Sequence, residues 1–226
     1  MYEYGRTIET EERAVVASTE FAAYMRELAD DRRRQPGQDL VSHLAAAEDG
    51  GERLSGDELV ASAILLLNAG HEASVNVFGN GLVAMLSRGL RPEDPVVAVE
   101  EMLRYDSALQ LFERTATEDV QVGDPGHGVL VEKGQKIAAL LGAANRDPAV
   151  FDQPDEMDLS RQPNQHLAFG AGVHFCLGAP LARMELAESL TALFATYPAL
   201  RLVGEPESRG TFVLRGFRRV SVGGGS

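Results

Sequence analysis

The stretch that decides the fold is Phe169-Gly-Ala-Gly-Val-His-Phe-Cys-Leu-Gly178, which holds the only cysteine of the 226-residue chain. Pro180, a residue type favoured at the first position of a helix, follows Cys176 closely. A sulfur just ahead of a helix N-terminus meets free backbone N–H donors and the positive end of the helix dipole, and both favour the thiolate over the thiol. The glycines let the backbone turn sharply and approach a large flat partner. The segment therefore indicates a thiolate with chemistry of its own.

Other interpretations of Cys176 stay open on these residues alone. Cysteine is often a buried small hydrophobe, here in a glycine-rich turn. His174 lies two residues away, and a Cys–His pair is how a thiol protease activates sulfur. No third group that would orient such a pair is evident, and close sequence neighbours rarely meet face to face. A zinc site is weaker still, because Cys176, His174 and the distant His166 give no tetrahedral ligand set at a recognised spacing.

Composition narrows the function classes. The 21 basic and 34 acidic residues give a net charge of −13, which argues against nucleic acid or an anionic membrane surface as the main partner. Met1–Arg6 lacks the features of a signal peptide, and the most apolar window, Leu59–Leu67, is far shorter than the ~20 residues of a membrane span. A single cysteine excludes an intrachain disulfide. We expect a cytoplasmic protein that neither binds nucleic acid nor crosses a membrane.

Apolar periodicity, caps and breakers predict a mainly α fold with small β elements (α+β). Ser55 and Glu58 have the spacing of a capping box, and Asp94-Pro95 is a cap followed by a first-turn proline. The helix after Ser55 is long, and we expect it to be central and buried on most sides. Its middle, Asn68–Asn76, carries Gly and polar residues, which suggests a site. The expected helices are 9–34, 39–48, 55–88, 95–105 and 180–197; the expected strands are 120–122, 129–131 and 137–141; a turn is expected at 48–52, a terminal hairpin of 212–214 with 220–222, and a flexible Gly/Ser tail at 223–226.

The segment 169–178, with the following Ala-Pro-Leu-Ala-Arg-Met-Glu185, resembles the haem-binding loop and next helix of the cytochrome P450 family in its soluble bacterial form. Three further motifs agree in the family's order. Ala69-Gly-His-Glu-Ala-Ser74 resembles the oxygen-activating segment, Glu101-Met-Leu-Arg104 is similar to the Glu-x-x-Arg pair, and Ala144-Asn-Arg-Asp-Pro148 with Asp158-Leu-Ser-Arg161 resembles the stretch before the haem loop. The resemblance implies the C-terminal portion of the cytochrome P450 fold, as one truncated domain over residues 1–222.

The resemblance also implies roles for single residues. Cys176 would be the axial thiolate of the haem iron, the only metal ligand, and would push electron density toward the metal so that the O–O bond of a bound dioxygen breaks. The remaining haem contacts that it implies are His174 and Arg114 at the propionates, Phe169 beside the sulfur, Gly170 and Gly178 in the loop, and Ala69 and Gly70 on the distal face.

Glu101 and Arg104 stand three residues apart and so share a helix face. From spacing alone they are a surface pair worth a few tenths of a kcal/mol. The family resemblance instead implies a buried ion network completed by Arg161, which supports the proximal side of the haem and takes no part in the chemistry.

The sequence departs from the family in two places. Glu72 supplies the acid of the central helix, but Ala73 stands where an alcohol is usual, and Ser74 is rotated by about 100° from it. We expect proton delivery by ordered water or by a hydroxyl of the substrate. The chain also lacks counterparts of the family's N-terminal half and of a helix between residues 88 and 95. Such a chain would expose apolar faces, which a homodimer could cover.

The leading functional hypothesis is a haem-thiolate monooxygenase that inserts one atom of dioxygen into a small apolar organic substrate. Its electrons would come from NAD(P)H through a ferredoxin reductase and a ferredoxin. One alternative is a catalytically inert, truncated remnant that acts as an interaction module. Another is a haem peroxygenase, which needs no electron delivery and so tolerates Ala73 better.

Overall fold

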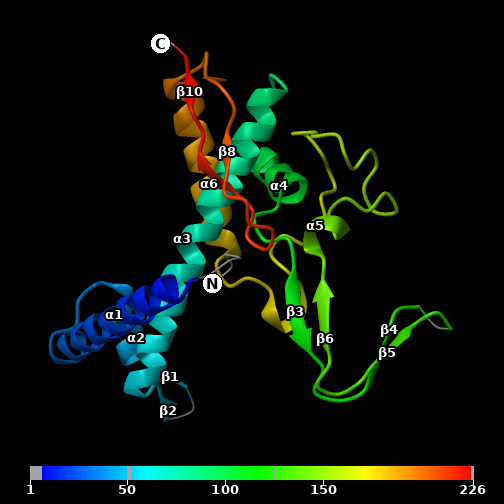
Figure 1. Ribbon diagram of the computed structural model, residues 1–226. Coiled ribbons are helices and arrows are strands. Elements are labelled where there is room, and N and C mark those ends of the chain that lie inside the picture. Colours follow the sequence, from blue (N-terminus) through cyan, green and yellow to red (C-terminus); the bar gives the residue numbers. More distant parts are fainter. Residues whose placement is uncertain (1–6, 50–51, 125, 225–226) are drawn as a thin grey trace. The chain divides into compact units, whose positions relative to one another are not determined.

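The computed structural model describes residues 7–49, 52–124 and 126–224 (Figure 1). Its contacts divide the chain into two compact units, the first extending to Glu72 and the second running from Ala73 onward. The boundary falls inside the longest helix, α3 (Gly56–Ser87). One domain over residues 1–222 stays a prediction.

Helices dominate both units, and the strands form short antiparallel pairs, which confirms the predicted mainly α fold with small β elements. The pairs within the described residues are β1–β2, β3–β6, β4–β5, β8–β9 and β7–β10. Besides α3 the helices are α1 (Ile8–Arg34), α2 (Leu40–Ala46), α4 (Pro95–Tyr105), α5 (Leu141–Ala144), the 3₁₀ turn η1 (Gly172–His174) and α6 (Ala179–Thr196). The strands are β1 (Glu48–Asp49), β2 (Glu52–Arg53), β3 (Phe112–Thr115), β4 (Val120–Val122), β5 (Val129–Val131), β6 (Lys136–Ala139), β7 (Arg201–Leu202), β8 (Glu207–Ser208), β9 (Phe217–Arg219) and β10 (Val222–Gly223).

The first unit packs α1 against α2 and the start of α3. Its small core is built on Met25, Val60 and Ala63. The capping box at the start of α3 is present, since Glu58 N–H donates to Ser55 Oγ at 3.3 Å and Ser55 N–H donates to a Glu58 carboxylate oxygen at 2.9 Å. Local side-chain chemistry therefore sets the first residue of the longest helix.

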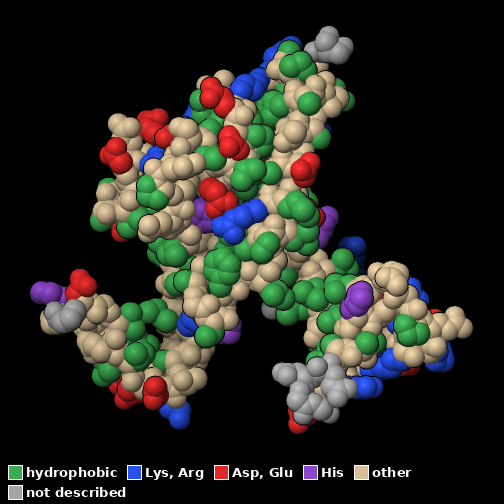
Figure 2. All heavy atoms as spheres, turned by 180° about the vertical axis from the view of Figure 1, so that it is seen from behind, with side chains coloured by type: hydrophobic (Ala, Val, Ile, Leu, Met, Phe, Trp, Pro, Cys, Tyr) green, Lys and Arg blue, Asp and Glu red, His purple; other side chains and the backbone are tan. Residues whose placement is uncertain are grey.

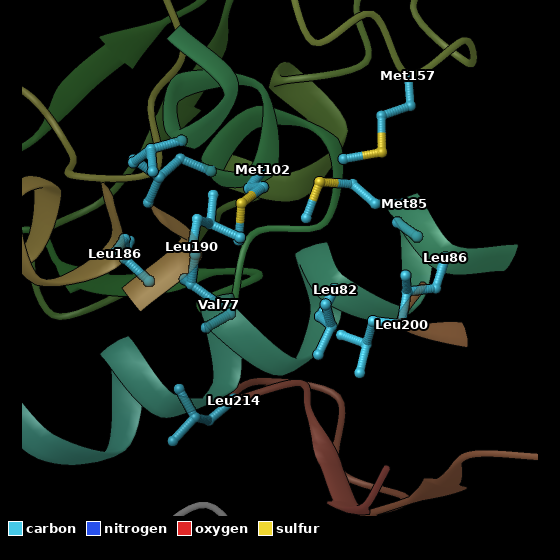
Figure 3. Packing of buried hydrophobic residues seen from close by; sticks show 14 residues of the cluster. Val77, Leu82, Met85, Leu86, Met102, Met157, Leu186, Leu190, Leu200 and Leu214 are labelled. Atoms are coloured by element: carbon cyan, nitrogen blue, oxygen red, sulfur yellow. The ribbon is translucent and has the colours of Figure 1, made fainter. Parts of the chain in front are cut away.

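The second unit has the larger core, where the C-terminal part of α3, α4 and α6 meet (Figure 3). Asp94 accepts hydrogen bonds from the N–H groups of Val96 and Val97, so α4 begins at Pro95 as its cap predicts. Gly81 of α3 faces Met102 of α4, where a Cβ on Gly81 would overlap the methionine side chain. The core residues are Val77, Leu82, Ala84, Met85, Leu86, Val99, Met102, Leu103, Ala108, Met157, Leu186, Leu190, Leu200 and Leu214.

The middle of α3 is exposed, so the expectation of a helix buried on most sides is wrong. Leu65, Leu67 and Val75 expose 65%, 58% and 57% of their surface. Leu65 and Leu67 stand two residues apart, so they point to different sides of the helix, and both sides are open there. Hydrophobic side chains reach the surface among the charged ones on the face shown in Figure 2 as well.

The predicted terminal hairpin is also wrong. Residues 217–219 pair with β8, Val222 pairs with Leu202 of β7, and Leu214 forms an isolated bridge with Leu109. These partners, in β8, in β7 and at Leu109, lie outside the two segments of the expected hairpin, so alternation within those segments could not reveal them. Gly223 belongs to β10 opposite Arg201, so a flexible tail does not begin there, and residues 225–226 lie outside the described residues.

Two smaller differences concern β structure. The helix expected over 39–48 ends at Ala46, and the turn expected at 48–52 joins the strands β1 and β2, with residues 50 and 51 outside the described residues. Strand β3, which was not predicted, pairs with β6 in a ladder from Phe112↔Ala139 to Thr115↔Lys136.

Candidate functional site

The loop before α6 is closed at its base by its own backbone. Cys176 N–H donates to the carbonyl of Phe169 at 3.0 Å, so the two ends of the loop lie together. Gly170 and Gly172 both have φ near +70°, a conformation that is strained for any residue with a Cβ. The glycines of the motif are thus what allows the chain to fold back on itself within seven residues.

The loop presents Cys176 at the entrance to α6. The thiol is free and half-buried. The Cys176 carbonyl accepts a hydrogen bond from Ala179 N–H at 3.3 Å, and Gly178 is the N-cap of α6, with Pro180 in the first turn. A Cβ at Gly178 would lie 3.9 Å from the Cys176 sulfur. The Cys176 sulfur therefore lies beside the first turn of α6.

Apolar residues flank Cys176 in the sequence, and their side chains are open to solvent. Val173 and Leu177 expose 98% and 85% of their surface, and Phe175 is half-exposed. Leu181 and Met184, in the first turns of α6, are exposed too. A single thiolate among apolar side chains suits a flat apolar cofactor that brings the other metal ligands itself, so the residues present fit a haem. The described residues contain no group of three or more His, Cys, Asp or Glu side chains that could hold a bare metal ion.

The two residues predicted to contact propionates are both exposed. Arg114 lies on β3, where Nη1 donates to the neighbouring Glu113 carbonyl at 3.0 Å and the guanidinium stands 5.0 Å from the Phe112 ring centroid. His174 ends η1 inside the cysteine loop. Within the described part of the chain neither residue is in an ion pair. The His174 ring and the Arg114 nitrogens other than Nη1 are thus available to anionic groups of a ligand.

Glu101 and Arg104 form a fully buried ion pair. Their side chains are 0% exposed, and Arg104 donates to the two carboxylate oxygens of Glu101 at 2.8 Å each. Arg161 Nε lies 3.2 Å from a Glu101 oxygen. The network implied by the resemblance is confirmed, and the alternative of a surface pair is wrong.

The same pair organises the chain that leads to the cysteine loop. Arg104 donates to the carbonyls of Asn145, Pro154 and Glu156 at 2.8 to 3.0 Å. The Glu101 carboxylate also accepts from the backbone N–H of Asp158 and from Asn164 Nδ2. Irregular backbone between residues 145 and 164 is therefore fixed by two side chains of α4.

A second cluster on α4 was not predicted from the sequence. Glu100 accepts from Arg183 Nε and Nη2 at 2.7 and 2.9 Å, and its Oε2 lies 3.0 Å from His166 Nε2. Burial raises the pKa of Glu100, but the hydrogen bonds from His166 and Arg183 outweigh it and lower the pKa from 4.5 to about 2. The partners lie 66 and 83 residues away in sequence. The only local signal was an acid beside the Glu-x-x-Arg pair.

The proton-delivery residues lie in the middle of α3. Glu72, the last residue of the first unit, and Ala73 and Ser74, the first of the second unit, are all half-buried. Ala69 and Gly70 are exposed and belong to the first unit, whereas Cys176 belongs to the second. The structure thus brings Phe169, Gly170, His174, Cys176 and Gly178 together in one loop.

Comparison with known proteins agrees with this loop. A family model described as Cytochrome P450 matches residues 97–210, which include most of α4, the buried ion network and the cysteine loop. The chain belongs to the cytochrome P450 family. It spans about half the length of the curated relatives that it matches.

Two curated bacterial P450s illustrate the similarity. Nocardicin C N-oxygenase of Nocardia uniformis subsp. tsuyamanensis is 46% identical over 210 residues, which cover 89% of this chain and 52% of the relative. The polyketide biosynthesis P450 PksS of Bacillus subtilis is 39% identical over 217 residues, 91% of this chain and 53% of the relative.

Solved P450 structures share the fold. PksS of Bacillus subtilis superposes with a TM-score of 0.90 at 36% identity, over 97% of this chain and 58% of its own. P450BioI, solved with an acyl carrier protein that bears hexadec-9Z-enoic acid, gives a TM-score of 0.89 at 35% identity, over 98% of this chain and 58% of its own. As regards membranes, the described helices include none that is both long and apolar enough to cross one.

Proposed function

We propose that this chain carries the haem-thiolate half of a monooxygenase that inserts one atom of dioxygen into a small apolar organic substrate. The observation that carries the proposal is the free, half-buried Cys176 thiol, held by a closed glycine loop at the start of α6 in a chain of the P450 family. The named relatives support oxygenase chemistry, since one of them is an N-oxygenase.

Family membership implies a haem-iron cofactor, and the loop residues fit it. Cys176 would bind the iron, Phe169, Gly170 and Gly178 would shape the backbone around the sulfur, and His174 and Arg114 would bind the propionates. On the distal side, the small residues Ala69 and Gly70 would leave room for dioxygen. When bound, the haem supplies activation of dioxygen at an iron whose reactivity the thiolate tunes.

The chain's own part in proton delivery centres on Glu72. A carboxylate on α3 can pass protons toward a distal pocket, but Ala73 has no hydroxyl to continue the path. We propose that ordered water, or a hydroxyl of the substrate, takes the place of that alcohol. Ser74 lies about 100° further around the helix and does not replace it.

Electrons would come from NAD(P)H through a ferredoxin reductase and a ferredoxin, as expected of a soluble bacterial P450 working in the cytoplasm. Exposed apolar side chains away from Cys176, such as Leu65 on α3 and Val96 on α4, would also permit a homodimer that covers them.

The experiment that tests the function is the absorption spectrum of the reduced, carbon-monoxide-bound protein after haem supplementation. A strongly red-shifted, thiolate-type Soret band is expected, and it should disappear in Cys176→Ala. A protein that takes up no haem would instead be the inert interaction module. Product formed with peroxide in the absence of any reductase would favour the peroxygenase, for which Ala73 is no handicap.

A further inference from the structure

The segment 164–168, which leads into the cysteine loop, is held by two consecutive carboxylates of α4. They contact its first and third residues, Asn164 and His166. Glu101 accepts a hydrogen bond from Asn164 at 3.1 Å, and Glu100 lies 3.0 Å from His166. Leu167 N–H donates to Asn145 Oδ1 at 2.7 Å. The approach segment 164–168 is therefore tied to the α4 network just before Phe169.

Both nitrogens of His166 are engaged, which fixes its ring. Nδ1 accepts a hydrogen bond from Ala168 N–H at 3.2 Å. A ring nitrogen that accepts carries no proton, so the proton of the neutral ring is on Nε2 and points at Glu100. The side chain of His166 is 2% exposed. Glu100 thereby orients a buried ring that packs 5.8 Å from the Phe169 ring.

Arg183 connects Glu100 to Phe169 directly. Its guanidinium makes the bidentate pair with Glu100 and lies 4.6 Å from the centroid of the Phe169 ring, within cation–π range. The hydrogen bonds that Arg183 donates to Glu100 hold the pKa of Arg183 above its ordinary value. Phe169 is thus packed between Arg183, His166 and the edge of Phe175.

Phe169 passes this constraint to the cysteine through the backbone. Its carbonyl is the acceptor for Cys176 N–H, so any rotation of the Phe169 peptide moves the hydrogen bond that closes the loop. Glu100 and Arg183 come from α4 and α6, two helices packed against each other in the core. The packed helices α4 and α6 therefore fix the side of the cysteine loop that carries Phe169.

We propose that Glu100 and Arg183 are a second pair of positioning residues, separate from Glu101 and Arg104, which hold Phe169 and through it the backbone of Cys176. The proposal rests on the proposed function, because it takes the positioned Cys176 sulfur as the iron ligand. The ordering of the cysteine loop by Glu100 and Arg183 does not depend on haem.

The test uses the variants Glu100→Gln, Arg183→Gln and Arg183→Lys. The control is Glu188→Gln, which makes the same carboxylate-to-amide change at an exposed position on α6. In the chain without haem, hydrogen–deuterium exchange at the Cys176 amide is expected to become roughly tenfold faster in the first two variants, because each loses charge-assisted hydrogen bonds. Arg183→Lys keeps the charge but lacks the planar fork and the stacking, and should rescue only part of the protection. Glu188→Gln should match the wild type.

Exchange at Leu103 separates positioning from general destabilisation, because this amide lies in the buried part of α4. If Cys176 and Leu103 speed up equally, or if Cys176 exchanges as in Glu188→Gln, the proposal is overturned. The double variant Glu100→Gln/Arg183→Gln should speed exchange at Cys176 by less than the product of the two single effects, because the bidentate pair is lost in each single variant already. Additive effects would contradict a shared role.

The carbon-monoxide spectrum of the haem-loaded protein is the second readout. Glu100→Gln and Arg183→Gln should convert part of the thiolate-type band to a band at shorter wavelength, whereas Glu188→Gln should not. Variants that retain the full thiolate band contradict the positioning of the sulfur. A wild-type chain that takes up no haem counts against the proposed function, and the exchange experiment then still decides whether Glu100 and Arg183 order the loop.

Discussion

Arg104 Nη2 lies 2.8 Å from Glu101 Oε1, with both side chains fully buried, and the guanidinium also reaches three carbonyls that lie 41 to 52 residues further along the chain. Glu101→Gln would leave a buried guanidinium without its counter-charge. We expect a loss of about 3–5 kcal/mol in the free energy of unfolding, as for other buried pairs that lose one partner. Urea unfolding at neutral pH measures it, and a loss below that of the exposed control Glu113→Gln on β3 would contradict the prediction.

Two glycines on α3 make a matched pair. A Cβ on Gly81 would overlap Met102, with 2.9 Å to its Cβ, whereas a Cβ on Gly79 would meet nothing within 4 Å. Gly81→Ala should lower the free energy of unfolding by roughly 1–3 kcal/mol through overpacking. Gly79→Ala should raise it by up to about 1 kcal/mol, because alanine favours the helix. Thermal melts of both variants check the opposite signs.

Glu100 should make the protein sensitive to acid. Its pKa in the folded chain is about 2 against an ordinary 4.5, so the stability that its charge contributes is present above pH 4.5 and is lost as the pH falls toward 2. The gap in unfolding free energy between wild type and Glu100→Gln should therefore narrow over this interval. Urea titrations at several pH values measure it; a gap that widens on acidification would contradict the assignment.

Asp106 should have the opposite dependence. Burial raises its pKa, and the charges of Arg215 and Arg146 offset this only in part. Asp106 is also the C-cap residue of α4, at the helix end where the dipole disfavours negative charge. Above the raised pKa the ionised group destabilises the fold, so Asp106→Asn should raise the melting temperature at neutral pH. The difference should vanish as the pH falls through the folded pKa of Asp106 toward its unfolded value.

Ala73→Thr tests the route of the proton. If ordered water or the substrate replaces the alcohol, the variant should leave the fraction of electrons that end in product nearly unchanged. The measurement compares NAD(P)H consumed with product formed in a reconstituted system. A sharp improvement in coupling would mean that the native path is defective at Ala73.

Local chemistry predicted the helix starts. The caps at Ser55 and Asp94 act within three residues, so the sequence contains their whole geometry. The buried Glu101 network was expected only through the resemblance to P450s, because an i,i+3 pair by itself carries no information on burial. The residues of the cysteine loop do lie together as expected, but their roles toward a haem stay predictions.

What could not be predicted depends on contacts distant in sequence. Arg183 meets Glu100 across 83 residues, and β10 pairs with β7 although the alternation near the C-terminus favoured a local hairpin. The middle of α3 illustrates the same limit, because its apolar residues predicted burial but are exposed in the structure. Apolar residues on a helix indicate a surface that another segment can cover, but they do not identify that segment.

The adjacency of Glu100 and Glu101 constrains how α4 can change in evolution. Each residue inserted into or deleted from an α-helix turns everything beyond it by about 100°. One such event between Pro95 and Ala98 would turn both carboxylates away from Arg161 and Arg183, their partners on other segments, at once. Substitutions at an exposed position such as Val96 touch neither network. In the homologous proteins, α4 should therefore vary in the identity of its outward residues while the number of residues between its cap and its two acids remains constant.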